Sequence, residues 1–95
     1  MKTIREIKDS LSWETSQDSR AELCLNFLGA ELKPKDIHEE DLEKLTSHLK
    51  TRGIKGSTIN RYLASVSKIL KYAYQRPNVY NMARVPHIVW QEESK

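Results

Sequence analysis

Three basic residues, seven and three positions apart, have the types and spacing best suited to chemistry in this sequence. They are Arg61, Lys68 and Lys71, and they fall in a segment with the apolar period of a long helix. On such a helix they share one side, and two turns, about 10.5 Å, separate Arg61 from Lys68. Cations at that spacing can neutralise phosphates along a nucleic-acid groove. Ala64 lies between them and leaves room for a close approach.

The residues that precede and open this helix add small polar groups. Backbone N–H groups at a helix start bind phosphate oxygens, and the hydroxyls of Ser57 and Thr58 would add two more donors there. The amide of Asn60 can hydrogen-bond base edges or phosphates. The sequence therefore predicts a DNA-binding set that consists of Lys55, Ser57, Thr58, Asn60, Arg61, Lys68 and Lys71.

The two halves of the chain carry opposite charge. Residues 1–47 hold seven Lys or Arg against eleven Asp or Glu, a net charge of −4. Residues 48–95 hold nine against two, a net charge of +7, and no acidic residue occurs from Lys44 to Gln91. A helix side that is merely solvated usually mixes both signs. The pattern therefore favours a polyanionic partner, and we expect double-stranded DNA.

Other residue groups in the sequence predict no catalytic centre. The acidic run 39–41 suits the first turn of a helix, where the helix dipole favours carboxylates. Cys24 is the single cysteine and lies in an apolar run, so we expect a buried thiol. The three histidines, His38, His48 and His87, share no zinc-binding spacing. We therefore expect no catalytic residue, no metal, no cofactor and no enzyme activity in this chain alone.

Apolar spacing predicts four helices that would position these side chains. The first and shortest covers about residues 3–11, and three longer ones are expected at 17–28, 38–52 and 58–75. Ser16 and Ser57 are the expected N-caps of the second and fourth helices. Since no segment alternates convincingly with period two, the sequence predicts an all-α, four-helix bundle.

Two expectations concern packing. In the second predicted helix, one face is expected to hold Ala21, Cys24, Phe27 and Leu28, with Leu23 and Leu25 at its edges. Pro77 is expected to end the last long helix, because the residue before a proline is pushed out of the α region. Beyond it the sequence has no long period, and the apolar residues expected to pack back onto the bundle are Met82, Val85, Ile88 and Trp90.

The length of 95 residues suits one domain, expected to cover residues 1–90. The longest apolar runs are only a few residues long, too short to span a membrane. The first eleven residues are charged throughout and lack the apolar core of a secretory signal. We therefore expect a cytoplasmic location without membrane contact, and a monomer for the isolated domain.

Residues 28–76, LGAELKPKDIHEEDLEKLTSHLKTRGIKGSTINRYLASVSKILKYAYQR, resemble a known module. A leucine-rich helix, a glycine-containing turn and then the residues STINRYL, with Ala73 further along, are similar to the N-terminal core-binding (SAM-like) domain of phage integrases, the tyrosine site-specific recombinases. The tail VPHIVWQEESK resembles the linker to the catalytic domain of that family, with residues 91–95 as its start.

The resemblance implies a SAM-like helical bundle that forms half of a C-shaped clamp on duplex DNA beside the crossover site. By position it implies contacts from the start of the long helix, Lys55 to Arg61, extended by Lys68, with Arg20 and Asn26 as candidates on earlier helices. The strand-cleaving residues of the family belong to a following domain and have no counterpart here. The chain would then be the DNA-binding part of a recombinase that oligomerises on DNA and acts in DNA integration.

Two alternatives remain open from the sequence. A helical protein–protein adaptor, whose basic helix docks on an acidic partner, accounts for the charge split almost as well. A helix-turn-helix regulator would read bases with a short recognition helix, whereas the helix expected at 58–75 is long for that task. A duplex titration that maps the response along the chain distinguishes DNA binding from the adaptor.

Overall fold

The computed structural model describes residues 2–82 and 84–92, and every regular element in that part of the chain is helical. The elements are α1 (Ile4–Ser10), α2 (Thr15–Leu28), the short 3-10 helix η1 (Pro34–Asp36), α3 (Glu39–Thr51), α4 (Gly56–Tyr74) and α5 (Pro77–Tyr80). The prediction of an all-α bundle is confirmed. The four expected helices correspond to α1, α2, α3 and α4, whereas η1 and α5 were not predicted. None of the helices in the described residues is long and apolar enough to cross a membrane.

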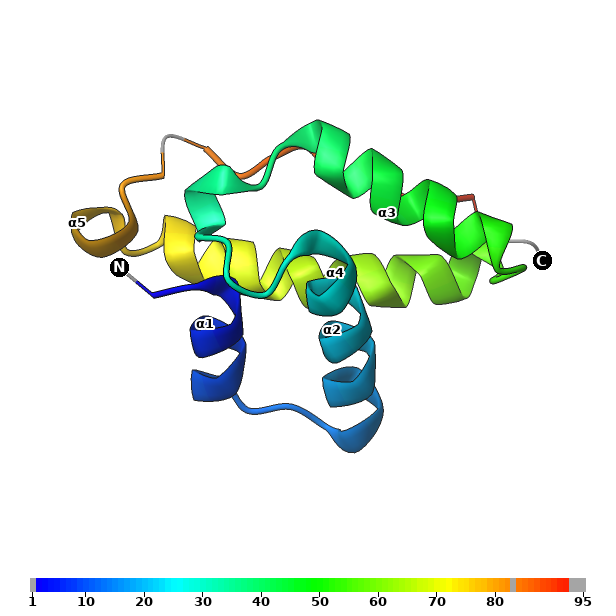
Figure 1. Cartoon of the computed structure of the whole chain (residues 1–95), viewed down its shortest axis with the longest axis horizontal. Helices are drawn as coiled ribbons and strands as arrows, with labels where there is room; N and C mark the ends of the chain where they lie inside the picture. The colour runs from blue at the N-terminus through cyan, green and yellow to red at the C-terminus, as the bar shows by residue number, and fades with distance from the viewer. Residues whose placement is uncertain (1, 83, 93–95) are drawn as a thin grey trace.

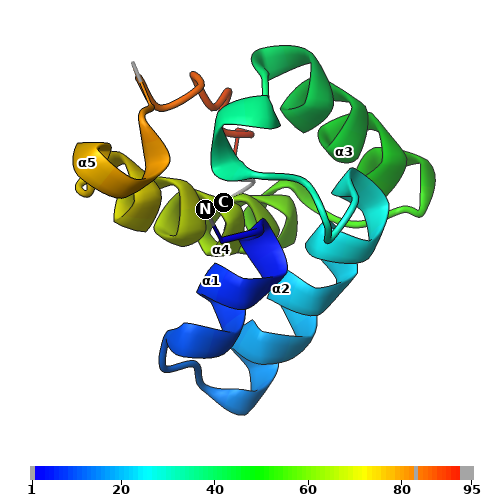
Figure 2. The same ribbon diagram turned by 60° about the vertical axis from the view of Figure 1, so that its left-hand side comes forward.

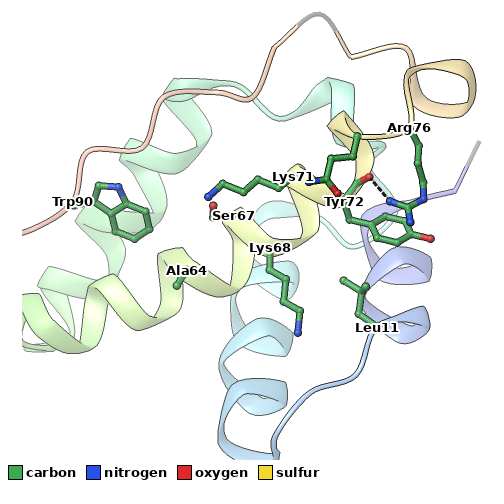
Figure 3. A pocket seen from close by; sticks show the side chains of 9 residues that line it. Leu11, Ala64, Ser67, Lys68, Lys71, Tyr72, Arg76 and Trp90 are labelled. Carbon is green, nitrogen blue, oxygen red and sulfur yellow. Dashed lines mark hydrogen bonds between the residues drawn. The ribbon is translucent and has the colours of Figure 1, made fainter.

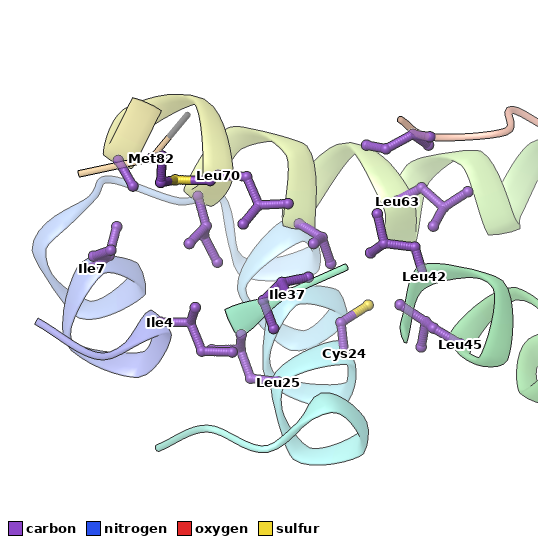
Figure 4. Close-up of a cluster of buried hydrophobic side chains, with 14 of the residues drawn as sticks. Ile4, Ile7, Cys24, Leu25, Ile37, Leu42, Leu45, Leu63, Leu70 and Met82 are labelled. Atoms are coloured by element: carbon purple, nitrogen blue, oxygen red, sulfur yellow. The ribbon is translucent and has the colours of Figure 1, made fainter. Parts of the chain in front are cut away.

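Helix α4 is the axis on which the other elements pack. It contacts α1, α2, η1, α3 and α5. Figures 1 and 2 show α1 and α2 on one side of α4 and α3 on another. Its buried apolar side chains recur with the period of a helix and form one face, and Ser65 and Ser67 are buried as well. That face meets the apolar sides of the other helices in one cluster (Figure 4), which includes Ile4, Ile7, Leu25, Leu42, Leu45, Leu63 and Leu70.

The buried face of α2 differs from the expected one at Phe27 and at Leu25. Ala21, Cys24 and Leu25 are buried, whereas Phe27 is 39% exposed. At 100° per residue, Leu25 lies 40° from Ala21 on the helix wheel, while Phe27 lies about 120° away. The expectation that Phe27 belongs to the core is therefore wrong. Leu28, whose position on the wheel is close to that of Ala21, is half-buried against the cluster.

Two expected helix starts are also wrong. Helix α2 begins at Thr15 with Glu14 at the N-cap position, not after Ser16. Helix α4 begins at Gly56, with Lys55 in the extended conformation of an N-cap. The first residue of α4 is restricted to glycine, because a Cβ on Gly56 would lie 2.5 Å from the carbonyl oxygen of Glu92.

The residues after Pro77 form more structure than their lack of period suggests. Pro77 ends α4 as expected but then occupies the first turn of α5, a position that suits its fixed φ. The segment 84–92 returns from the α5 end of the molecule to the end where α4 begins (Figure 1). Met82 and Ile88 are buried and Val85 packs against the core, as expected, but Trp90 is 51% exposed.

A network of ion pairs joins α1 to α2. Lys8 as a residue is only 6% exposed, and its ammonium lies 2.6 Å from Oδ1 of Asp18 and 3.1 Å from Oε2 of Glu22. The Arg5 guanidinium lies 2.6 Å from Oε1 of Glu22. The hydrogen bond from Arg5, followed by the one from Lys8, holds the pKa of the Glu22 carboxyl below its ordinary value. The folded protein therefore binds a proton at Glu22 less readily than the unfolded chain.

This difference predicts an acid-dependent loss of stability. A carboxyl whose pKa is lowered by folding stabilises the protein above its unfolded pKa, and that stabilisation is lost as the pH falls through the folded value. We expect Glu22→Gln to flatten part of the decline in unfolding free energy between about pH 5 and pH 3, measured with urea. Glu43→Gln is the matched control, because Glu43 is exposed on α3. An equal effect of both substitutions would contradict the prediction.

Candidate nucleic-acid interface

The exposed side of α4 carries the predicted cations. Arg61, Lys68 and Lys71 are all exposed, and the apolar face of the same helix holds them there by packing inward. Within residues 2–82 and 84–92, the ion pairs use Arg5, Lys8 and Arg84, and none includes a cation of α4. The positive charge of this helix side is therefore not neutralised by a carboxylate in the described part of the chain.

Lys68 is held in place by the connection between α1 and α2. Its ammonium donates a hydrogen bond of 2.7 Å to the backbone oxygen of Ser12 and lies 4.3 Å from the ring centroid of Trp13. The indole of Trp13 is itself fixed, since its N–H donates to the backbone oxygen of Lys8 at 2.7 Å. An ammonium has three N–H donors, so Lys68 is oriented at this face and keeps donors for a ligand.

A fourth cation, Arg76, extends the same side past the end of α4. Its guanidinium carbon lies 3.7 Å from the ring centroid of Tyr72, and its Nη1–H donates to the backbone oxygen of Tyr72 at 3.0 Å. These two contacts fix a planar donor group at the surface. The sequence interpretation missed Arg76 as a site residue, although the acid-free stretch that contains it was the available signal.

A groove of about 500 Å³ runs along this side of α4 (Figure 3). None of the residues that line it is acidic, and three are cationic. Ala64 and Ser67 are small side chains between the cations and Trp90, so the groove is open there. The full lining consists of Leu11, Ala64, Ser67, Lys68, Lys71, Tyr72, Gln75, Arg76 and Trp90.

A second hollow, of about 380 Å³, adjoins the groove and shares Ala64 and Lys68 with it. It brings Arg61 of α4 together with Arg20 of α2, a residue that the family resemblance singled out. One carboxylate, that of Glu14, also lines it. The two hollows together place Arg20, Arg61 and the groove cations on one connected surface.

The start of α4 has a different environment from its middle. The side-chain amide of Asn60 makes two hydrogen bonds with the backbone of Gln91. Its Nδ2–H donates to the Gln91 carbonyl oxygen at 2.9 Å, and its Oδ1 accepts from the Gln91 N–H at 2.7 Å. Lys55 is exposed, whereas Ser57 and Thr58 are half-buried. Asn60 thus has a structural role that the sequence interpretation missed, because its partner lies 31 residues away.

Other candidates for chemistry do not form a reactive centre in the described residues. Burial raises the pKa of the Cys24 thiol to about 12, so the nucleophilic thiolate is scarce at neutral pH. Among residues 2–82 and 84–92, no group of three His, Cys, Asp or Glu side chains could hold a metal ion. The acidic run at the start of α3 lies in its first turn, and Glu39 there pairs with Arg84 at 2.6 Å.

Comparison of the chain with protein-family models, with curated proteins and with solved structures gives no match.

Proposed function

We propose that this chain is a DNA-binding domain whose α4 helix contacts the phosphates of duplex DNA. The observation that carries the proposal is the exposed side of α4, where cations stand without a carboxylate partner in the described residues. Proteins usually intersperse both signs on a solvated surface. All charged residues of α4 are cations along its length of about five turns, and such a helix is suited to a polyanionic partner.

The cationic side chains of this surface differ in how firmly they are held. Lys68 and Arg76 are fixed by contacts to Ser12, Trp13 and Tyr72, so little side-chain entropy is lost when they bind phosphate. Arg61 and Lys71 are exposed and can follow the backbone of the duplex. These contacts orient the bundle on DNA and carry no sequence information by themselves.

The resemblance of residues 28–76 to the core-binding domain of tyrosine recombinases gives the proposal a biological setting. In that setting the domain clamps duplex DNA beside the crossover site during DNA integration or recombination, in the cytoplasm. The strand-cleaving residues belong to another part of the parent enzyme, which assembles into an oligomer on DNA. The isolated domain is a monomer that binds DNA without cutting it.

A salt series with a fluorescently labelled duplex tests the proposal. Three or four phosphate contacts predict a plot of log affinity against log salt with a slope of about −3, at about −0.9 per contact. The affinity itself is expected to be weak, with a dissociation constant on the order of 10⁻⁴ to 10⁻⁶ M at physiological salt. Backbone amide shifts should concentrate on α4 and on Arg20 of α2.

Two results would contradict DNA binding by this face. One is the absence of any duplex affinity at low salt, where phosphate contacts are strongest. The other is a set of amide shifts that lies away from α4. An acidic peptide that binds α4 while duplex DNA does not would instead support the adaptor function.

A further inference from the structure

Trp90 is a large aromatic side chain that the fold leaves 51% exposed at the edge of the basic groove. Its backbone is held in place, because the N–H and the carbonyl oxygen of the next residue, Gln91, are both hydrogen-bonded to the side chain of Asn60. One residue further on, the Glu92 carbonyl lies so close to Gly56 that a Cβ there would be 2.5 Å from its oxygen. The exposure of Trp90 is therefore a feature of an anchored segment and not of a loose end.

The surroundings of Trp90 combine an aromatic surface with cations. Figure 3 shows its indole beside Ala64 and Ser67, with the Lys71 side chain directed toward the same part of the groove. Lys68 lies on α4 and Arg76 just past its end, so two more cations line the same groove. Since none of the lining residues is acidic, an anion can follow the groove without meeting a like charge.

An exposed aromatic ring beside cations favours an unpaired strand over a duplex as the ligand of this groove. In a duplex the faces of the bases are stacked inside, so an aromatic ring on a protein surface gains little from them. An unpaired base offers its π-face, and stacking on an aromatic side chain tolerates any base. Tyr72 is less suited to this task, because Arg76 covers its ring at 3.7 Å and Tyr80 lies at its edge. Trp90 is thus the stacking surface that the groove offers.

We propose that the groove binds a single-stranded nucleic-acid segment, with one unpaired base stacked on Trp90 and neighbouring phosphates at Lys71, Lys68 and Arg76. This inference rests on the proposed function, since the same side of α4 supplies the cations. It adds a second kind of ligand, which is a strand that is opened, gapped or displaced beside the bound duplex. The groove binds the base without sequence preference, because stacking and phosphate contacts supply the affinity.

The test compares a short oligothymidine with a duplex on the wild-type domain and on Trp90 variants. Trp90→Ala is expected to weaken oligothymidine binding by about 5- to 150-fold, the range that corresponds to one stacked base. Its affinity for the duplex should stay within about twofold, since phosphate contacts dominate there. Trp90→Phe should restore most of the single-strand affinity, and the indole N–H resonance of Trp90 should shift as oligothymidine is added.

Val89→Ala is the matched control. Val89 is 58% exposed on the same segment but lines a different hollow, so its truncation should leave both affinities unchanged. If the Trp90 indole resonance of the wild-type domain does not move with oligothymidine while the duplex binds, the inference is wrong and the proposed function stands. Equal losses for both nucleic acids in Trp90→Ala would also overturn it. Failure of the wild-type domain to bind either nucleic acid overturns both proposals.

Discussion

Replacing Leu70 with alanine is expected to lower the free energy of unfolding by about 2–5 kcal/mol. Leu70 is fully buried in the core cluster, where Figure 4 shows it near Met82. The truncation removes apolar contacts and leaves a cavity on the one helix that every other element packs against. A domain of this size has only about 5–15 kcal/mol of stability in total, so the variant should unfold at a much lower urea concentration.

The neighbouring substitution Lys71→Ala gives the matched control. Lys71 is the next residue on α4 but is exposed, so its truncation opens no cavity and should change stability by less than about 0.5 kcal/mol. Urea titrations of the two variants should give the same dependence on denaturant as the wild type and differ only in midpoint. A loss below about 1 kcal/mol for Leu70→Ala would contradict the central place of α4 in the core.

The positions of the long helices could be predicted because their apolar residues repeat locally. The apolar period that predicts a helix at 58–75 matches the buried apolar residues of α4, which include Ile59, Leu63 and Leu70. Distant residues could not be predicted in the same way. The Glu92 carbonyl lies where a Cβ of Gly56 would stand, and no pattern near Gly56 in the sequence predicts a contact with a residue 36 positions away.

The same distinction holds for the candidate site. Arg61, Lys68 and Lys71 were predicted to share one exposed side of a helix, and the structure confirms this, since the helical period alone sets it. The hydrogen bond from Lys68 to Ser12 spans 56 residues and could not be predicted. The exposure of Trp90 was also missed, because an apolar side chain in a short segment gives no periodic signal for which way it points.

Removal of two exposed cations from α4 is expected to have the largest effect on DNA binding. Arg61→Ala together with Lys71→Ala should weaken duplex affinity on the order of 50-fold at about 0.1 M salt, because each lost phosphate contact forfeits its counterion release. The slope of log affinity against log salt should become shallower by about 2. Circular dichroism should remain that of the wild type, since both side chains are exposed.

The choice of Lys71 over Lys68 follows from the geometry. Truncation of Lys68 would also remove the hydrogen bond to Ser12 and the contact with Trp13, so a loss of binding could come from a displaced α1–α2 connection. The matched control is Lys33→Ala with Lys35→Ala. These two exposed lysines lie at the start of η1 and within it, and their removal changes the net charge equally. If the control pair loses as much affinity as the α4 pair, net charge and not the side of α4 determines binding, and the assigned interface is wrong.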